Sequence, residues 1–189
     1  RSTLVGVGDA RGLADVSRVL ALAARERNQL DEAERHARAA ADAYDAVGAL
    51  DRAGEADLVV ASVAYGRGGF DQVRARLAPR LVALEAAGHS VMAARVAAML
   101  LPADAAAGAW ERYEDHLALA VPLVRAPDLA LADALLLAGD QAMYRFGLGE
   151  QAGRAWRLAR QAFGALDVPK GVLAADERLA ELAAGDHNG

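Results

Sequence analysis

Gly68-Gly69-Phe70-Asp71-Gln72-Val73 is one copy of a phrase that returns along this chain about every forty residues. The other copies occupy residues 28–33, 108–113 and 147–152, and only the last interval is one residue shorter. A fixed period of this length is typical of stacked copies of one supersecondary unit, because a single unit cannot bury its apolar face alone. The phrase therefore predicts a repeat protein.

The composition favours an all-α fold for these repeats. Alanine and leucine, both strong helix formers, are the commonest residues, and only 5% of the residues are aromatic. Apolar residues recur with helical spacing, and glycines follow several of the predicted helix ends. The predicted helices cover residues 13–26, 32–47, 51–66, 70–87, 90–106, 109–125, 128–146, 149–165 and 169–184. Asp31 and Glu34 are predicted to form a capping box at the start of the second helix.

These helices are predicted to form one array over residues 13–184. A lead-in is expected over residues 1–12 and a tail over residues 185–189. The four helix-turn-helix repeats are expected over residues 13–48, 51–88, 90–126 and 128–166, and the capping helix over residues 169–184. One face of the last helix carries Val172, Ala175, Leu179 and Leu182, and acidic residues lie on the other. Because helical arrays need an end with a polar side, this helix is predicted to be the cap.

The repeated phrase resembles the tetratricopeptide repeat. In that family a small residue near the turn is followed by an apolar residue four positions on and a small residue three after that. The series here reads Ala33-Ala37-Ala40, Val73-Leu77-Arg80, Tyr113-Leu117-Ala120 and Ala152-Trp156-Ala159. Arg80 departs from the pattern, the period is about forty instead of thirty-four, and the family's closing proline is missing. Repeats of this longer kind resemble those in the regulatory regions of bacterial serine/threonine kinases and signalling ATPases.

The resemblance implies a right-handed α-solenoid that binds a peptide or protein segment in a concave groove lined by the first helix of each pair. The groove residues implied in this way are Arg18, Leu22, Glu55, Leu58, Ser62, Tyr65, Asp140 and Tyr144. In the fourth pair, Met143 is the alternative to Tyr144, because that repeat is one residue short. Tyr65 is the main candidate anchor for a partner; the alternative is that its ring packs against the adjacent turn. A basic edge formed by Arg154, Arg157 and Arg160 is either a solvated face or a second docking edge.

No motif for chemistry accompanies the repeats, so we expect no enzymatic activity and no cofactor. The four histidines lack metal-ligand spacing, and the glycines form no phosphate-binding loop. Asp115 and His116 are interpreted as an exposed pair. The net charge of −5 disfavours nucleic-acid binding, and no apolar run is long enough to cross a membrane.

The expected function is that of a protein-interaction module, as the scaffold or regulatory part of a larger cytoplasmic signalling protein of bacteria. Its partner would be another protein, a peptide or another domain of a longer parent protein. We expect such a parent protein because the sequence opens on Arg1 without a methionine. Two alternatives stay open: a helical domain of a transcription regulator that senses a small molecule, and a spacer or oligomerisation domain beside a kinase, ATPase or caspase-like protease. The sequence leaves the oligomeric state open.

Overall fold

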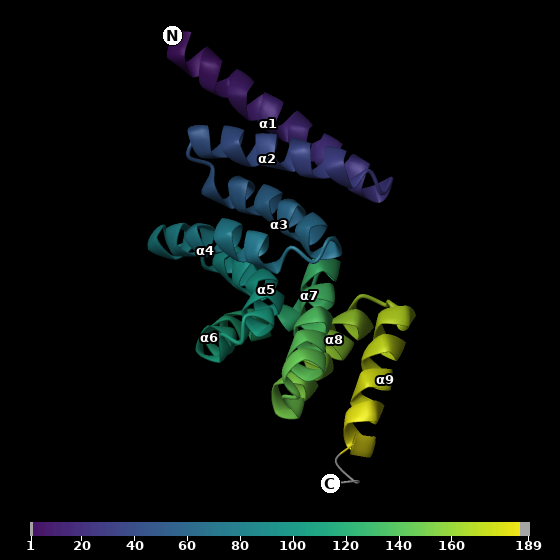
Figure 1. Ribbon diagram of the computed structural model, residues 1–189. Coiled ribbons are helices and arrows are strands. Elements are labelled where there is room, and N and C mark those ends of the chain that lie inside the picture. Colours follow the sequence, from purple (N-terminus) through teal and green to yellow (C-terminus); the bar gives the residue numbers. More distant parts are fainter. Residues whose placement is uncertain (1, 186–189) are drawn as a thin grey trace. The chain divides into compact units, whose positions relative to one another are not determined.

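The computed structural model describes the backbone of residues 2–185 and the side chains of residues 10–184. All regular structure in this range is helical (Figure 1), which confirms the predicted all-α class. Each helix packs mainly against its neighbours in the sequence. The elements are α1 Ser2–Glu26, α2 Leu30–Ala46, α3 Leu50–Gly66, α4 Phe70–Ala86, α5 Ser90–Ala106, α6 Trp110–Ala120, η1 Val121–Arg125, α7 Leu129–Asp140, η2 Gln141–Arg145, α8 Gly149–Ala165 and α9 Pro169–Gly185.

One turn geometry repeats along the chain and sets the period. Seven turns have a central residue with positive φ, between 53° and 75°: Asn28, Gly48, Gly68, Gly88, Gly108, Gly147 and Asp167. The amide after this residue usually bonds back to a carbonyl of the preceding helix, as Ala49 N does to Tyr44 O at 2.9 Å. Glycine, asparagine and aspartate are the residues that adopt this conformation most readily. The two periods from Asn28 to Gly108 each contain two helices and two such turns, whereas the period from Gly108 to Gly147 has only one such turn, at its start.

The missing residue of the last interval lies before α7. Pro127 occupies the place of the turn glycine there, and the preceding helical segment ends as the 3₁₀ helix η1. A 3₁₀ helix rises about 2.0 Å per residue against about 1.5 Å in an α-helix, so the shorter segment keeps nearly the full helix length. The π-helix η2 ends the next segment.

The chain divides into two compact units, Arg1–Val96 and Ala97–Gly189, and the boundary lies within α5. In unit 1 the helices α1 to α4 follow one another as a stack (Figure 1). Its core contains many small side chains, such as Ala21 and Ala37, together with the fully buried Tyr44, Leu77 and Leu84. Unit 2 has a core of larger side chains, among them Tyr113 and Phe163.

The predicted core positions at the start of the second helices are confirmed. Ala33, Val73, Tyr113 and Ala152 are each at most 1% exposed. The apolar face of α9 is also confirmed, since Val172, Ala175, Leu179 and Leu182 pack toward the core of unit 2. The single array over residues 13–184 stays a prediction.

Several local predictions differ from the structure. The lead-in is helical, because α1 begins at Ser2 instead of residue 13. Asp31 is not the N-cap of α2: the helix begins at Leu30 after Gln29, which makes no side-chain cap. Asp31 and Glu34 instead bind the guanidinium of Arg67, which lies in the turn between α3 and α4. The tail is predicted from residue 185, yet Gly185 still belongs to α9, and residues 186–189 lie outside the described range.

Candidate functional site

The apolar members of the predicted groove in unit 1 belong to its interior. Leu58 on α3 is only 7% exposed. Leu22 on α1 is half-buried and packs against the cluster that contains Ala21 and Val60. Ser62 donates its hydroxyl to the carbonyl of Val59 at 3.0 Å, within its own helix. These three side chains therefore stabilise the stack, and little of them is left for a partner.

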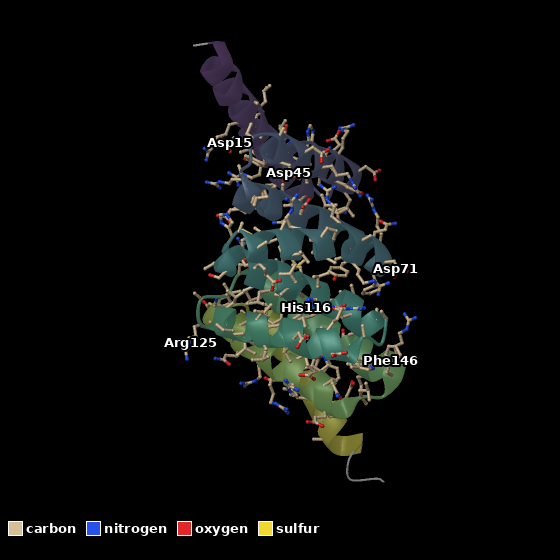
Figure 2. All side chains as sticks on the ribbon, turned by 90° about the vertical axis from the view of Figure 1, so that its left-hand side faces the viewer. Asp15, Asp45, Asp71, His116, Arg125 and Phe146 are labelled. Carbon is tan, nitrogen blue, oxygen red and sulfur yellow. The ribbon has the colours of Figure 1, made fainter. Side chains whose placement is uncertain are left out.

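The two charged members of the predicted groove in unit 1 differ in their contacts. Glu55 accepts a hydrogen bond from Arg52 at 3.0 Å on the exposed surface of α3. The hydroxyl of Tyr44 donates to the carboxylate of Asp15, which is labelled in Figure 2, while the buried Nε of Arg18 has no hydrogen-bond partner among the described residues. Burial and the nearby Asp15 raise the pKa of Tyr44. The hydrogen bond from Tyr44 to Asp15 thus joins α2 to α1.

Tyr65 packs against the following turn, as the alternative interpretation expected. Its side chain is half-buried, and its ring centroid lies 5.5 Å from that of Phe70 at an interplanar angle of 53°. Phe70 is the first residue of α4. The ring pair links the end of one helix to the start of the next, which is a packing role.

The predicted residues of unit 2 both contact α9. Asp140 accepts hydrogen bonds from the indole of Trp156 at 3.0 Å and from Nη2 of Arg178 at 2.9 Å. The hydroxyl of Tyr144 donates to Glu181 at 3.1 Å. Asp140 is half-buried, whereas the side chain of Tyr144 stays 63% exposed. The structure also distinguishes the two alternatives in the fourth pair, because Met143 packs against the core cluster of Trp156 and Tyr144 points outward.

Two exposed aromatic residues, Tyr144 and Phe146, lie at the end of η2, and each has its own ring partner. Phe146, which is 41% exposed, meets the ring of Trp110 edge to face at a centroid distance of 5.3 Å. The ring of Tyr144 lies 6.2 Å from that of Trp156, and the guanidinium of Arg145 lies 5.7 Å from the centroid of Phe146. We call Tyr144, Phe146 and the half-buried Trp110 the aromatic surface. Phe146 is labelled in Figure 2.

Sequence reasoning missed Phe146. The signal available for it was its position directly before the turn glycine Gly147, where the other turns carry arginine or aliphatic residues. The π-helix η2 was not predicted either, although it aims Tyr144 outward. π-Helical turns inside α-helices are frequent at functional sites.

A buried carboxylate in unit 1 explains the departure of Arg80 from the repeat pattern. Asp57 on α3 is 1% exposed and accepts hydrogen bonds from Nε of Arg76 at 2.6 Å and Nε of Arg80 at 2.8 Å. Arg80 also binds both carboxylate oxygens of Asp45 on α2 at 2.6 Å (Figure 2). These carboxylates raise the pKa of Arg80. The arginine thus joins three helices, and its alanine counterparts in other repeats cannot do so.

A second buried carboxylate lies in unit 2, where it corrects the prediction for His116. Nδ1 of His116 lies 2.6 Å from Oδ2 of Asp104, which is 1% exposed, and the imidazole itself is only 13% exposed. Nε of Arg112 donates to the same carboxylate at 3.3 Å. The predicted exposed pair of His116 with Asp115 is therefore wrong. The predicted helix pair over residues 90–126 places these two helices side by side, but the period does not reveal which of their side chains meet.

The basic edge of α8 is largely paired. Arg154 forms an ion pair with Glu114 at 2.8 Å, and Arg160 pairs with Asp176. Arg157 is exposed. Because two of the three arginines already bind carboxylates of unit 2, this edge fits a solvated, self-neutralised surface better than a docking edge.

Other classes of site were sought in the part of the chain that the structure describes. It contains no cluster of three or more His, Cys, Asp or Glu side chains that could hold a metal ion. Within the same residues, no helix combines the length and the apolar character that crossing a membrane requires. No protein-family model matches the chain, and no curated protein shows significant similarity to it.

Tyr113→Phe is expected to raise the free energy of unfolding by about 1 kcal/mol. The Tyr113 side chain is fully buried, and its hydroxyl has no hydrogen-bond partner among the described residues. Burial, and then the charge of Glu114, raises the pKa of Tyr113 well above its usual value of 10.0. Above about pH 10 the unfolded chain loses this proton while the folded chain keeps it, so folding weakens as the pH rises.

Urea denaturation at pH 7 and at pH 10.5 measures both effects. The advantage of Tyr113→Phe over the parent chain should grow at the higher pH. Tyr144→Phe is the matched control, because it removes an exposed hydroxyl and should bring no gain at pH 7. A destabilised Tyr113→Phe variant would contradict the interpretation that the hydroxyl is unsatisfied.

Proposed function

We propose that the chain is a protein-interaction module of tetratricopeptide type, a right-handed solenoid that works within a bacterial signalling protein in the cytoplasm. The observation that carries the proposal is the aromatic surface of unit 2. Tyr144 and Phe146 are large exposed side chains on a scaffold of packed helices, and aromatic residues are enriched at protein interfaces. The resemblance of the repeats supports the same class of function.

The contacts of the aromatic surface favour an apolar anchor as the bound group. Phe146 and Tyr144 offer exposed ring faces, while Trp110 beneath Phe146 is held by a second edge-to-face contact with Tyr113 at 5.7 Å. A partner side chain seated here would displace water from preformed rings, with little ordering cost. The predicted groove residues of unit 1 support a binding role less well than the aromatic surface does, since Leu58 and Tyr65 pack within unit 1.

Peptides selected against the immobilised full-length chain from a random displayed library provide the probe. For a selected peptide, Phe146→Ala or Tyr144→Ala should weaken binding about tenfold to thirtyfold, as truncation of an interface anchor typically does. Val82→Ala removes a comparably exposed apolar side chain from α4 and should leave affinity unchanged. Fluorescence anisotropy measures the affinities, and far-ultraviolet circular dichroism checks that each variant is folded.

Salt dependence separates this surface from the arginine edge of α8. Binding to apolar rings should change little between low and high salt, whereas binding to Arg157 and its neighbours should weaken strongly. Peptides that bind Phe146→Ala as tightly as the parent chain would show that the aromatic surface is not the binding site.

A further inference from the structure

The outward side of α1 is apolar. Leu13, Val16, Val19 and Leu20 are 68%, 56%, 57% and 45% exposed, and their spacing places them along one side of the helix. We call these four residues the outer stripe of α1. The adjacent side of the helix is buried at Ala14 and Ala21. α1 is the first helix of the stack in unit 1 (Figure 1).

The same stripe is buried in the next repeat. Forty residues after the outer stripe, α3 carries Ala53, Ala56, Val59 and Val60, which are at most 6% exposed. The residues that cover them belong to the preceding helix pair: Ala14, Ala21, Ala37, Ala40, Ala41 and Tyr44. In α3, this stripe is therefore the surface against which the preceding helix pair packs.

Unit 2 repeats this arrangement with other residues. The corresponding stripe of α7 includes Ala132, Leu135 and Ala138, all at most 2% exposed, and it packs in one cluster with Leu101 of α5 and Leu117 of α6. The matching positions of α9 include Val172 and Leu179, which pack against clusters that contain residues of α7 and α8. Among these first helices, α1 alone has the stripe exposed.

The far side of α9 has a different character. Its exposed residues include Lys170, Glu177 and Glu181, and Leu173 is its one large apolar side chain with high exposure among the described residues. Terminal helices of repeat proteins keep their outer side polar, because exposed contiguous apolar surface promotes association. The outer stripe of α1 has the composition of an internal surface of the array.

We propose that the outer stripe of α1 is an interface for a further helix pair of the same forty-residue type. The second helix of that pair would lie on α1 as α2 lies on α3, with small side chains at the positions of Ala37, Ala40 and Ala41. This partner fits the stripe because the equivalent stripe of α3 is covered by the second helix of a pair, α2, through Ala37, Ala40 and Ala41. The inference is independent of the aromatic surface and of the proposed function.

A thiol reporter tests the interface. The chain has no cysteine, so Val19→Cys introduces a single reactive group into the outer stripe. A second, longer chain duplicates the first helix pair. In it, residues 1–48 are followed directly by residues 9–189. Because residue 9 is equivalent to residue 49, this junction keeps the turn at Gly48 and the forty-residue period. The reporter is placed in the second copy of α1 in this longer chain.

In the longer chain, labelling of Val19→Cys should be at least about tenfold slower than in the 189-residue chain. The thiol is then covered by the added helix pair and can react only when that pair opens locally. The control is Arg11→Cys, at the position equivalent to Asp51, which stays exposed on α3. This thiol should react at the same rate in both chains. Slow labelling of Val19→Cys alone supports the interface.

Equal labelling of Val19→Cys in the two chains would overturn the proposal. A parent chain that forms a stable dimer by light scattering, with Val19→Cys protected in that dimer, would also overturn it and assign the stripe to a second copy. Because Phe146→Ala leaves α1 unchanged, failure of the proposed peptide binding and failure of this interface are distinguishable.

Discussion

Asp57→Ala is expected to lower the free energy of unfolding by about 3–5 kcal/mol. The carboxylate is 1% exposed and is the shared partner of Arg76 and Arg80, and the side chain of Arg80 is itself only 11% exposed. Removing it leaves the positive charge of Arg80 without one of its two carboxylate partners in a place that water hardly reaches. Arg80 keeps the partly exposed Asp45, which is 40% exposed and does not replace the buried bond.

The double variant Asp57→Ala/Arg80→Ala tests whether the loss comes from the stranded charge. Other repeats carry Ala40, Ala120 or Ala159 where this one has Arg80, and all three are buried without strain. The double variant should therefore be more stable than Asp57→Ala alone. Urea denaturation of the full chain measures the differences, and Asp71→Ala is the control, since its 90% exposed carboxylate contributes little. Simple additivity of the two single losses would contradict the proposed coupling.

Gly139→Ala is expected to cost about 3 kcal/mol, a large value for the addition of one methyl group. A Cβ on Gly139 would lie 2.5 Å from Cδ1 of Trp156, well inside van der Waals contact. The indole cannot easily move away, because it is 1% exposed and donates its N–H to Asp140. The variant must therefore shift α7 against α8 or break this hydrogen bond.

Thermal denaturation should show a melting midpoint about 10 °C lower for Gly139→Ala. Gly164→Ala is the matched control in the same unit, since a Cβ at this helical glycine meets no atom within 4 Å. Alanine has the higher helix propensity, so the control should gain up to about 1 kcal/mol. Equal behaviour of the two variants would mean that α7 and α8 are less closely packed than the structure indicates.

The helices and turns could be predicted from the sequence because their causes are local. The glycines at positions 48, 68, 88 and 108 end helices by adopting positive φ, and that preference belongs to the residue itself. The burial of Ala33 and Ala152 followed from the repeat, since a position that is core in one copy is core in the others. The predicted bounds of the middle helices consequently agree with the observed ones to within about one residue, apart from the 3₁₀ and π-helical ends.

The predicted capping box at Asp31 was wrong because it considered only local contacts. A carboxylate near a helix start satisfies the local pattern, but Arg67 in the turn between α3 and α4 competes for both Asp31 and Glu34. That competition depends on the spacing of successive turns in the stack. Sequence reasoning could not decide the exposure of Tyr65 either, because that exposure depends on where the ring of Phe70 lies.

By itself, the sequence determined the helical class, the period and the residues that face the core, because helix propensity, turn conformation and apolar periodicity act over a few residues. Tertiary structure decided which distant side chains meet: Asp57 with Arg80, and Asp104 with His116. It also decided which apolar surfaces are covered. Leu20 and Val60 occupy equivalent positions, yet only Val60 has a preceding helix pair packed over it, and the burial of an apolar side chain depends on such a neighbour.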